Sequence, residues 1–179
     1  MIAGVDEVGL GCLAGPVIAS AIILSGRGSE RTYKDSKKNS EKQRAENYYF
    51  LRRNCYFGIG VASPMEVDQL NVLKASHLAM IRAVDSLPVK PSKIIIDGKY
   101  IPEGLKNAES IIKGDQFIQE ISAASNFAKY YRDSLMAAYH QQLPNYNFKT
   151  NKGYPTLEHK DAISAFGLSM IHRKSFKIK

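Results

Sequence analysis

The sequence predicts an α/β domain, in which helices cover a β-sheet. Its opening stretch, Ile2–Leu24, contains two short apolar runs that predict neighbouring strands. Another strand is predicted at Pro91–Asp97, where three consecutive isoleucines are typical of a strand buried on both faces of a sheet. Apolar residues at helical spacing then extend over 116–142 and predict a long helix.

Size and composition narrow the class of protein. The chain has 179 residues, 44% hydrophobic and 23% charged, which predicts a single globular domain over 1–179. Its formal net charge of +8 favours a polyanionic partner, nucleic acid first. No apolar run reaches the roughly 18 residues of a membrane helix, and signal-peptide features are lacking, so we expect a cytoplasmic protein with no membrane partner. Cys12 and Cys55 lack metal-ligand spacing and are interpreted as packing residues.

Two adjacent acids, Asp6 and Glu7, end the first apolar run, and three glycines follow within eight positions. Strands tolerate acids and glycine poorly, so this pattern favours a site that a ligand approaches closely. Successive strand side chains point to opposite faces, so both acids reach one ligand only if the chain bends after Val5. We expect Gly9 and Gly11 to permit that bend.

The two acids also suggest a chemistry. Neighbouring carboxylates without a nearby histidine or cysteine suit Mg²⁺ or Mn²⁺ rather than zinc. A solvated acidic turn after a strand explains the pair equally well, because acids are mostly exposed. Spacing alone leaves both interpretations open.

The segment Ser25–Ser40 is rich in glycine, serine and lysine, and is predicted to be a surface loop. At its end Ser36, Lys37 and Lys38 put a hydroxyl beside two ammonium groups. Such a cluster can hold a phosphate backbone, and a solvated charge run is the alternative.

The next elements follow from local signals. Ser40 and Gln43 form a capping-box pattern that predicts a helix to about residue 53. Cys55–Ala62 is predicted as a strand. Apolar residues at near-helical spacing predict one helix over Val67–Leu87, with Pro88 ending it.

Asp97 ends the isoleucine-rich strand and is followed by Gly98. Open α/β sheets commonly place their chemistry at such strand ends, although an Asp-Gly turn explains the pair as well. A short strand is predicted at Ser110–Lys113, and Asp115 is interpreted as the N-cap of the helix over 116–142.

On that long helix, Lys129, Arg132 and Asp133 are interpreted as a solvated face or an ion-pair row. Beyond Pro144 the chain is predicted to form a loop up to Pro155, followed by a helix over Leu157–Phe166. In that loop an aromatic ring, Tyr154, is suited to stacking on a sugar or base, and packing under the loop is the alternative.

Taken together, these segments resemble the ribonuclease HII family, the bacterial type 2 ribonucleases H. The matching segments, in the family's order, are Gly4–Val17, Asp35–Lys38, Leu70–Ser76, Ile95–Gly98, Lys113–Asp115, Ile121–Asp133, Asn151–His159 and His172–Phe176. Each is weak alone, but the ordered set spans nearly the whole chain and is highly specific.

The resemblance implies a ribonuclease H-like fold, with a mixed central sheet flanked by helices over about 1–140 and a helical, substrate-binding C-terminal part over about 141–179. It implies endonucleolytic cleavage of RNA in RNA/DNA hybrids and of ribonucleotides embedded in duplex DNA, leaving a 5′-phosphate and a 3′-hydroxyl. It also implies a role in removing ribonucleotides during DNA replication and repair. By motif position, two divalent ions, Mg²⁺ or Mn²⁺, are held by Asp6, Glu7, Asp97 and Asp115.

A physical argument supports such a site. Two divalent ions roughly 3.5–4 Å apart can make a nucleophile available near neutral pH and stabilise the leaving oxygen of a phosphodiester. Four clustered acids without a cation repel one another, and this raises some of their pKa values. Metal binding removes that conflict, and the scheme requires no histidine base.

The resemblance also implies how substrate is recognised. The family usually carries Gly-Arg-Gly after the acids, a backbone that surrounds the 2′-hydroxyl, and a tyrosine at the RNA-to-DNA junction; Gly9, Gly11 and Tyr154 match these positions. Leu10 stands where Arg or Lys is usual, which removes one expected phosphate contact. Further substrate contacts are implied at Ser36, Lys37, Lys38, Asn71 and Arg173. Asn39 and Asn126 replace residues that are usually apolar and are interpreted as packing variation.

Other functions remain to be distinguished. Leu10 makes a catalytically impaired hybrid-binding protein one alternative, whereas the four acids favour an enzyme. A junction resolvase on the same fold is a third, which the segments Asp35–Lys38 and Gly153–Thr156 argue against. Ribonuclease HIII usually has a glutamate where this chain has Asp115. No sliding-clamp motif is evident at the C-terminus, and we expect a monomer.

Overall fold

The protein is described by a computed structural model that covers residues 1–34, 36 and 39–178. Its centre is a five-stranded sheet in the order β3-β2-β1-β4-β5. The strands are β1 Ile2–Val8, β2 Val17–Ile23, β3 Tyr56–Ala62, β4 Lys93–Asp97 and β5 Ala108–Ile111. β2 pairs antiparallel with both β1 and β3, whereas β4 pairs parallel with both β1 and β5. The sheet is therefore mixed, as expected.

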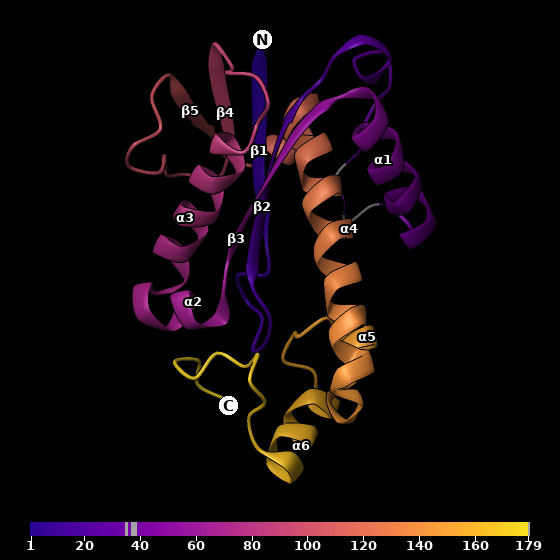
Figure 1. Ribbon diagram of the computed structural model, residues 1–179, viewed down its shortest axis with the longest axis vertical. Coiled ribbons are helices and arrows are strands. Elements are labelled where there is room, and N and C mark those ends of the chain that lie inside the picture. Colours follow the sequence, from indigo (N-terminus) through magenta and orange to yellow (C-terminus); the bar gives the residue numbers. More distant parts are fainter. Residues whose placement is uncertain (35, 37–38, 179) are drawn as a thin grey trace.

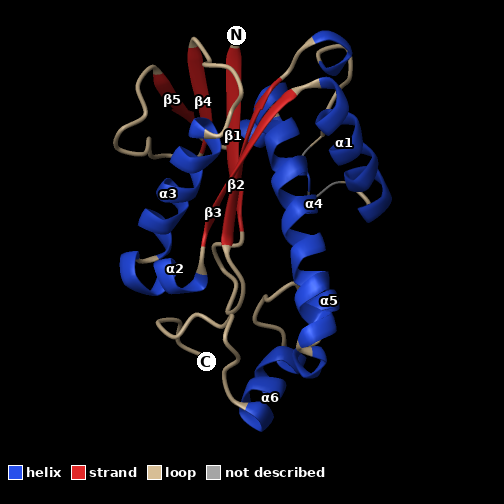
Figure 2. Cartoon of the chain, in the orientation of Figure 1, coloured by secondary structure: helices blue, strands red, loops and turns tan. Residues whose placement is uncertain are grey.

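Helices cover both faces of this sheet (Figures 1 and 2). The helices are α1 Glu41–Asn54, α2 Pro64–Leu70, α3 Val72–Asp85, α4 Gln119–Gln142, α5 Phe148–Asn151 and α6 Leu157–Phe166. One face is covered by α3, and the other by α4 with α1 packed against it. Among the helices of the described chain, none combines the length and apolar character that crossing a membrane would take.

Small residues allow α4 to cross β1 at short range. A Cβ atom at Gly4 would lie 2.2 Å from the main-chain carbon of Glu120, so only glycine fits there. Further along α4, Ala123, Ala124 and Phe127 pack into a fully buried cluster beside β2 and α1. This close crossing places the middle of α4 directly over the end of β1.

The predicted helix Val67–Leu87 is two helices. Asn71 interrupts it with a φ of 71°, and its side-chain oxygen accepts hydrogen bonds from the main-chain N–H groups of Leu73 (3.0 Å) and Lys74 (3.1 Å). An asparagine tolerates this backbone and caps the following helix. The apolar spacing continues across the break, which is why the sequence pattern did not reveal it.

The acidic segments also differ from expectation. β1 continues through Val8 without a bend after Val5, and the chain turns at Gly9 instead. Asp115 is not the N-cap of α4; that position is Ile118, without a side-chain cap, and Asp115 lies in a 3-10 turn, Gly114–Gln116.

The remaining boundaries agree more closely. Ser40 and Gln43 form the expected capping box, and Thr156 caps α6. β5 begins two residues before the predicted strand at Ser110. The segment predicted as a loop after Pro144 contains a 3-10 turn and the one-turn helix α5.

The C-terminal part packs against the end of α4 and the connection between β1 and β2. Its core consists of Leu13, Ala14, Met136, Tyr146, Phe148, Ile163 and Ile171. Because residues from both ends of the chain share this core, the C-terminal part and the sheet belong to one folded unit.

Two buried histidines lie inside the C-terminal part, and their hydrogen bonds fix their tautomers. The main-chain N–H of Ser169 donates to Nδ1 of His172 (2.9 Å), so this nitrogen carries no proton. Nε2 of His172 therefore donates to Nε2 of His159 (3.0 Å), and Nδ1 of His159 donates to the carbonyl of Tyr154 (2.8 Å). Two neutral imidazoles thus hold the backbone of Tyr154.

This pair predicts a loss of stability in mild acid. Burial, with a smaller contribution from His159, lowers the pKa of His172 to about 4 from 6.5. The stabilisation is full above pH 6.5 and is lost as pH falls towards about 4, because the unfolded chain takes up the proton first. The full loss is on the order of 3 kcal/mol. Urea unfolding at about pH 7 and about pH 4.5 measures it.

His172→Gln is the matched control, because it removes the titrating ring. Its unfolding free energy is expected to be lower than that of the wild type at neutral pH but less dependent on pH. An equal pH dependence in both proteins would contradict a role for His172.

Candidate active site

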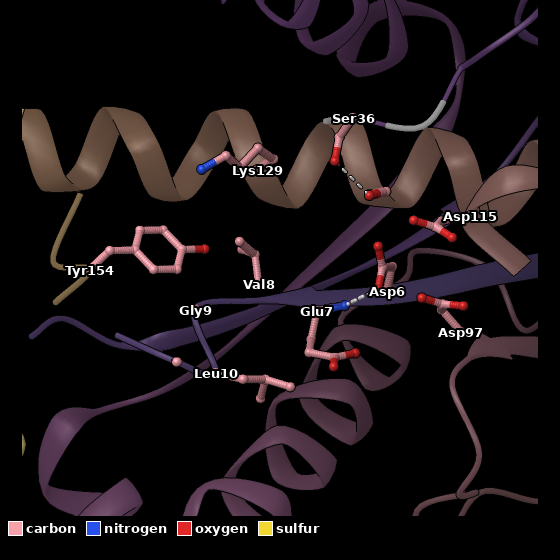
Figure 3. A pocket seen from close by; sticks show the side chains of 12 residues that line it. Asp6, Glu7, Val8, Gly9, Leu10, Ser36, Asp97, Asp115, Lys129 and Tyr154 are labelled. Carbon is pink, nitrogen blue, oxygen red and sulfur yellow. Dashed lines mark hydrogen bonds between the residues drawn. The ribbon is translucent and has the colours of Figure 1, made fainter. Parts of the chain in front are cut away.

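The ends of β1 and β4 bring acidic side chains together at one edge of the sheet. Asp6 and Asp97 come from these adjacent parallel strands, and Asp115 comes from the 3-10 turn that follows β5. The main-chain N–H of Gly114 donates to Asp97 (2.7 Å), which ties the turn to the strand end. Figure 3 shows the carboxyl groups of the three aspartates pointing towards one another.

These acids line one end of a cavity of about 330 Å³. Its lining residues are Asp6, Glu7, Val8, Gly9, Leu10, Gly11, Ser36, Asp97, Asp115, Ser125, Lys129 and Tyr154. Nine of them are among the predicted site residues, drawn from segments more than a hundred positions apart. The fold therefore assembles most of the predicted site in a single pocket.

Electrostatics at the acidic end are unfavourable for a fully charged site. Asp6 is only 6% exposed, and burial, followed by the charges of Glu7 and Asp97, raises its pKa well above the ordinary value. Hydrogen bonds from the Ser125 hydroxyl and the N–H of Glu7 (2.8 Å) oppose that rise in pKa. A cation near Asp6 would relieve the repulsion that raises its pKa.

Glu7 is oriented differently from the aspartates. Because β1 stays regular, its carboxyl group lies on the other side of the strand from that of Asp6 (Figure 3). Across the part of the chain that the structure describes, no three acidic, histidine or cysteine side chains already converge on one ion position. The donor chemistry nevertheless fits hard divalent cations, since carboxylate oxygens dominate this end of the pocket.

The connection between β1 and β2, which follows Asp6 and Glu7, is held by two buried arginines. Gly9 has a φ of 98°, and a Cβ atom there would lie 2.4 Å from Nε of Arg132. Arg132 donates to the carbonyls of Pro16 (2.9 Å), Ala14 (3.0 Å) and Lys152 (2.8 Å). It is fully buried, so its interpretation as part of a solvated face is wrong.

Arg173 holds the same segment from the opposite end of the chain. Its guanidinium donates to the carbonyls of Gly15 (2.9 and 3.0 Å) and Leu10 (3.0 Å). Burial lowers its pKa to about 10, which keeps it protonated at neutral pH. Being 1% exposed, it lies beneath the segment and supports it, contrary to the direct substrate contact expected from sequence.

At the far end of the pocket lies Tyr154, a residue that is 36% exposed. Nζ of Lys129 lies 5.6 Å from the ring centroid and 2.9 Å from a carboxylate oxygen of Asp133. Burial, followed by Cys12, raises the pKa of the Tyr154 hydroxyl to about 12, so it stays protonated. An aromatic face and a cation are thus placed opposite the acids (Figure 3).

Some predicted residues lie elsewhere. Asn71 caps α3 and lines a separate hollow beside Ser175, away from the acids. Ser36 lies in the pocket, with its hydroxyl 2.9 Å from that of Ser125. The predicted contacts Lys37 and Lys38 lie outside the described residues.

Two pocket residues, Ser125 and Lys129, were missed from sequence. They are one helical turn apart on α4, so both face the pocket. The available signal was this four-residue spacing within the family-matching segment Ile121–Asp133. It puts a hydroxyl and an ammonium group on the same face of the helix.

Comparisons with known proteins agree with this geometry. The family described as ribonuclease HII matches residues 3–179. A ribonuclease HII of Alteromonas mediterranea is 48% identical over 99% of this chain and 94% of its own length.

Solved structures give the same picture of the fold. The ribonuclease H2 of Pyrococcus horikoshii OT3 has a TM-score of 0.79 at 24% identity, covering 99% of this chain and 94% of that one. A Bst ribonuclease HIII in complex with Mn²⁺ has a TM-score of 0.79 at 17% identity, over 98% of this chain and 66% of that one. The family match and the close relative show that this chain belongs to the ribonuclease HII family, hydrolases that act on RNA–DNA hybrids.

Proposed function

We propose that this chain cuts the RNA strand of RNA/DNA hybrids and ribonucleotides embedded in duplex DNA, leaving a 5′-phosphate and a 3′-hydroxyl. One observation carries the proposal: a single pocket has carboxylates at one end, and a glycine-flanked backbone segment and a tyrosine at the other. The positive net charge supports a polyanionic substrate. We place this activity in ribonucleotide removal during DNA replication and repair.

Ribonucleases of this family depend on divalent metal ions. In our proposal Asp6, Glu7, Asp97 and Asp115 hold two such ions, Mg²⁺ or Mn²⁺. The Mn²⁺ complex of the similarly folded ribonuclease HIII and the raised pKa of Asp6 support the assignment. When bound, such ions stabilise charge on the phosphodiester and make a hydroxide nucleophile available near neutral pH.

The other residues of the pocket bind and orient the substrate. Among the described residues, no atom beyond Gly11 and its two chain neighbours lies within 4 Å of the place of a Cβ atom at Gly11, so the backbone there is open to a ribose and its 2′-hydroxyl. The ring of Tyr154 is placed to stack on the sugar or base next to the cut, and Lys129 is placed to contact a phosphate. These contacts hold the scissile phosphate near the acids.

Asp97→Asn tests the acidic end. Losing a metal ligand removes several kcal/mol of transition-state stabilisation, so kcat should fall about a thousandfold on a labelled RNA/DNA hybrid with Mg²⁺ or Mn²⁺. Hybrid binding should change little. Asp161→Asn, the same change on the exposed surface of α6, is the control and should cut normally.

Retained turnover in Asp97→Asn would contradict the assignment of the acids. A wild-type protein that binds the hybrid but cuts neither it nor a duplex with one ribonucleotide would instead support the alternative, a catalytically impaired hybrid-binding protein. Leu10 is the observation that favours this alternative.

Tyr154→Ala tests the other end of the pocket. Loss of base or sugar stacking should reduce kcat/KM at a single embedded ribonucleotide about tenfold to a hundredfold. A long hybrid should be cut with a smaller loss, because many positions offer productive binding. Tyr154→Phe keeps the ring and should retain the preference; equal losses of Tyr154→Ala on both substrates would remove the junction role.

Leu10→Arg tests the position that departs from the family. One added phosphate contact should tighten hybrid binding and steepen the slope of log K against log salt by about 0.9. Leu10→Gln, which adds length without charge, should leave the slope unchanged. Identical slopes in both variants would show that residue 10 does not face a phosphate.

A further inference from the structure

Asn126, on the buried side of α4, makes four hydrogen bonds although it is fully buried. Its amide nitrogen donates to the carbonyls of Lys34 (2.7 Å) and Ser122 (2.8 Å). Its amide oxygen accepts from the side chains of Asn39 (2.7 Å) and Asn47 (3.2 Å). An asparagine amide has two donors and two acceptor sites, so every one of them is used.

The partners of Asn126 show what this network holds. Lys34 and Asn39 flank the loop segment that contains Ser36, whereas Asn47 belongs to α1. Asn39 also donates to the carbonyl of Lys34 (3.2 Å), which joins the two flanks directly. One buried amide therefore fixes both flanks of this segment to α4.

Ser36 itself is held by Ser125, the residue that precedes Asn126 on α4. The hydroxyl of Ser36 lies 2.9 Å from that of Ser125, and both residues line the pocket that contains Asp6. Arg44 of α1 donates to the carbonyls of Ser36 (3.1 Å) and Asn39. Ser125 thus contacts Ser36, and Asn126 bonds to Lys34 and Asn39 on either side of it in sequence. Ser36 lies in the same pocket as the carboxylates (Figure 3).

Packing alone does not explain a polar residue at this place. Asn126 follows Ala123 and Ala124 on the buried side of α4, where an apolar side chain would avoid the desolvation of an amide. A fully satisfied polar network instead specifies one arrangement of the groups it joins. Here the groups joined are Lys34, Asn39, α1 and α4.

We propose that Asn126 and Asn39 are positioning residues for the reaction, which hold Lys34 and Ser36 at the pocket that takes the nucleic-acid strand. The inference rests on the proposed function, because it takes the bound strand to be the hybrid. Neither residue touches the reacting atoms. Their effect is expected on substrate affinity, with little effect on the chemical step.

The test measures the Kd of a labelled RNA/DNA hybrid in an Asp97→Asn background, so that cutting does not interfere. Asn39→Ala removes the link at the half-buried flank and leaves the core intact; Asn126→Leu removes the whole network. Each should raise Kd about fivefold to tenfold, the loss that one hydrogen bond's net free energy produces. In the active enzyme KM should rise similarly, with kcat within about twofold.

Asn47→Ala is the matched control. It removes one bond of the same network from the α1 side without touching the loop, so it should lower Tm and leave Kd and KM unchanged. Combining Asn39→Ala with Asn126→Leu should weaken binding by less than the sum of the two separate effects, because the two side chains share one hydrogen-bond network.

Unchanged Kd in Asn39→Ala would overturn the proposal even if Asn126→Leu failed to fold. An equal rise of Kd in Asn47→Ala would also overturn it, since general loosening would then explain the effect. A wild-type protein that binds the hybrid without cutting it would contradict the proposed function and still leave the comparison of Kd values decisive.

Discussion

The arrangement of this protein depends on two buried guanidinium groups that bind main-chain carbonyls. Arg132 and Arg173 come from α4 and from the C-terminal tail, and both hold the connection between β1 and β2. In the described part of the chain neither forms an ion pair with a carboxylate. Since removing a buried charge from its partners is costly, these bonds join the sheet, α4 and the C-terminal part into one unit.

The same unit keeps acids together that would otherwise repel one another. Asp6 is held by β1 and by the close crossing of α4, whereas Asp97 is tied to the turn that carries Asp115. The packing of the rest of the protein thus keeps these carboxylates close together despite their mutual repulsion, and their negative charges favour a cation. A site of this kind costs stability in the free protein and regains it when a cation binds.

The strand ends could be predicted from sequence, because apolar runs and the acids after them are local signals. Four acids and Tyr154 were placed in one site by the resemblance, and all five line one pocket of the structure. The break at Asn71 was hidden, since the apolar spacing continues through it. The burial of Arg132 and the network of Asn126 were hidden for another reason: most of their partners lie from about 80 to more than 110 positions away along the chain.

Because Arg173 bonds to the main-chain carbonyl of Leu10, the backbone conformation at this position does not depend on which side chain is present. Every amino acid has the carbonyl oxygen that the arginine binds, whereas Leu10 as a whole is 40% exposed. Natural variation or engineering can therefore exchange the group presented to a ligand without rebuilding its support. The side chain at position 10 can therefore change without a change in the hydrogen bond that holds its backbone. This explains how leucine can replace a cation there while the surrounding backbone keeps its conformation.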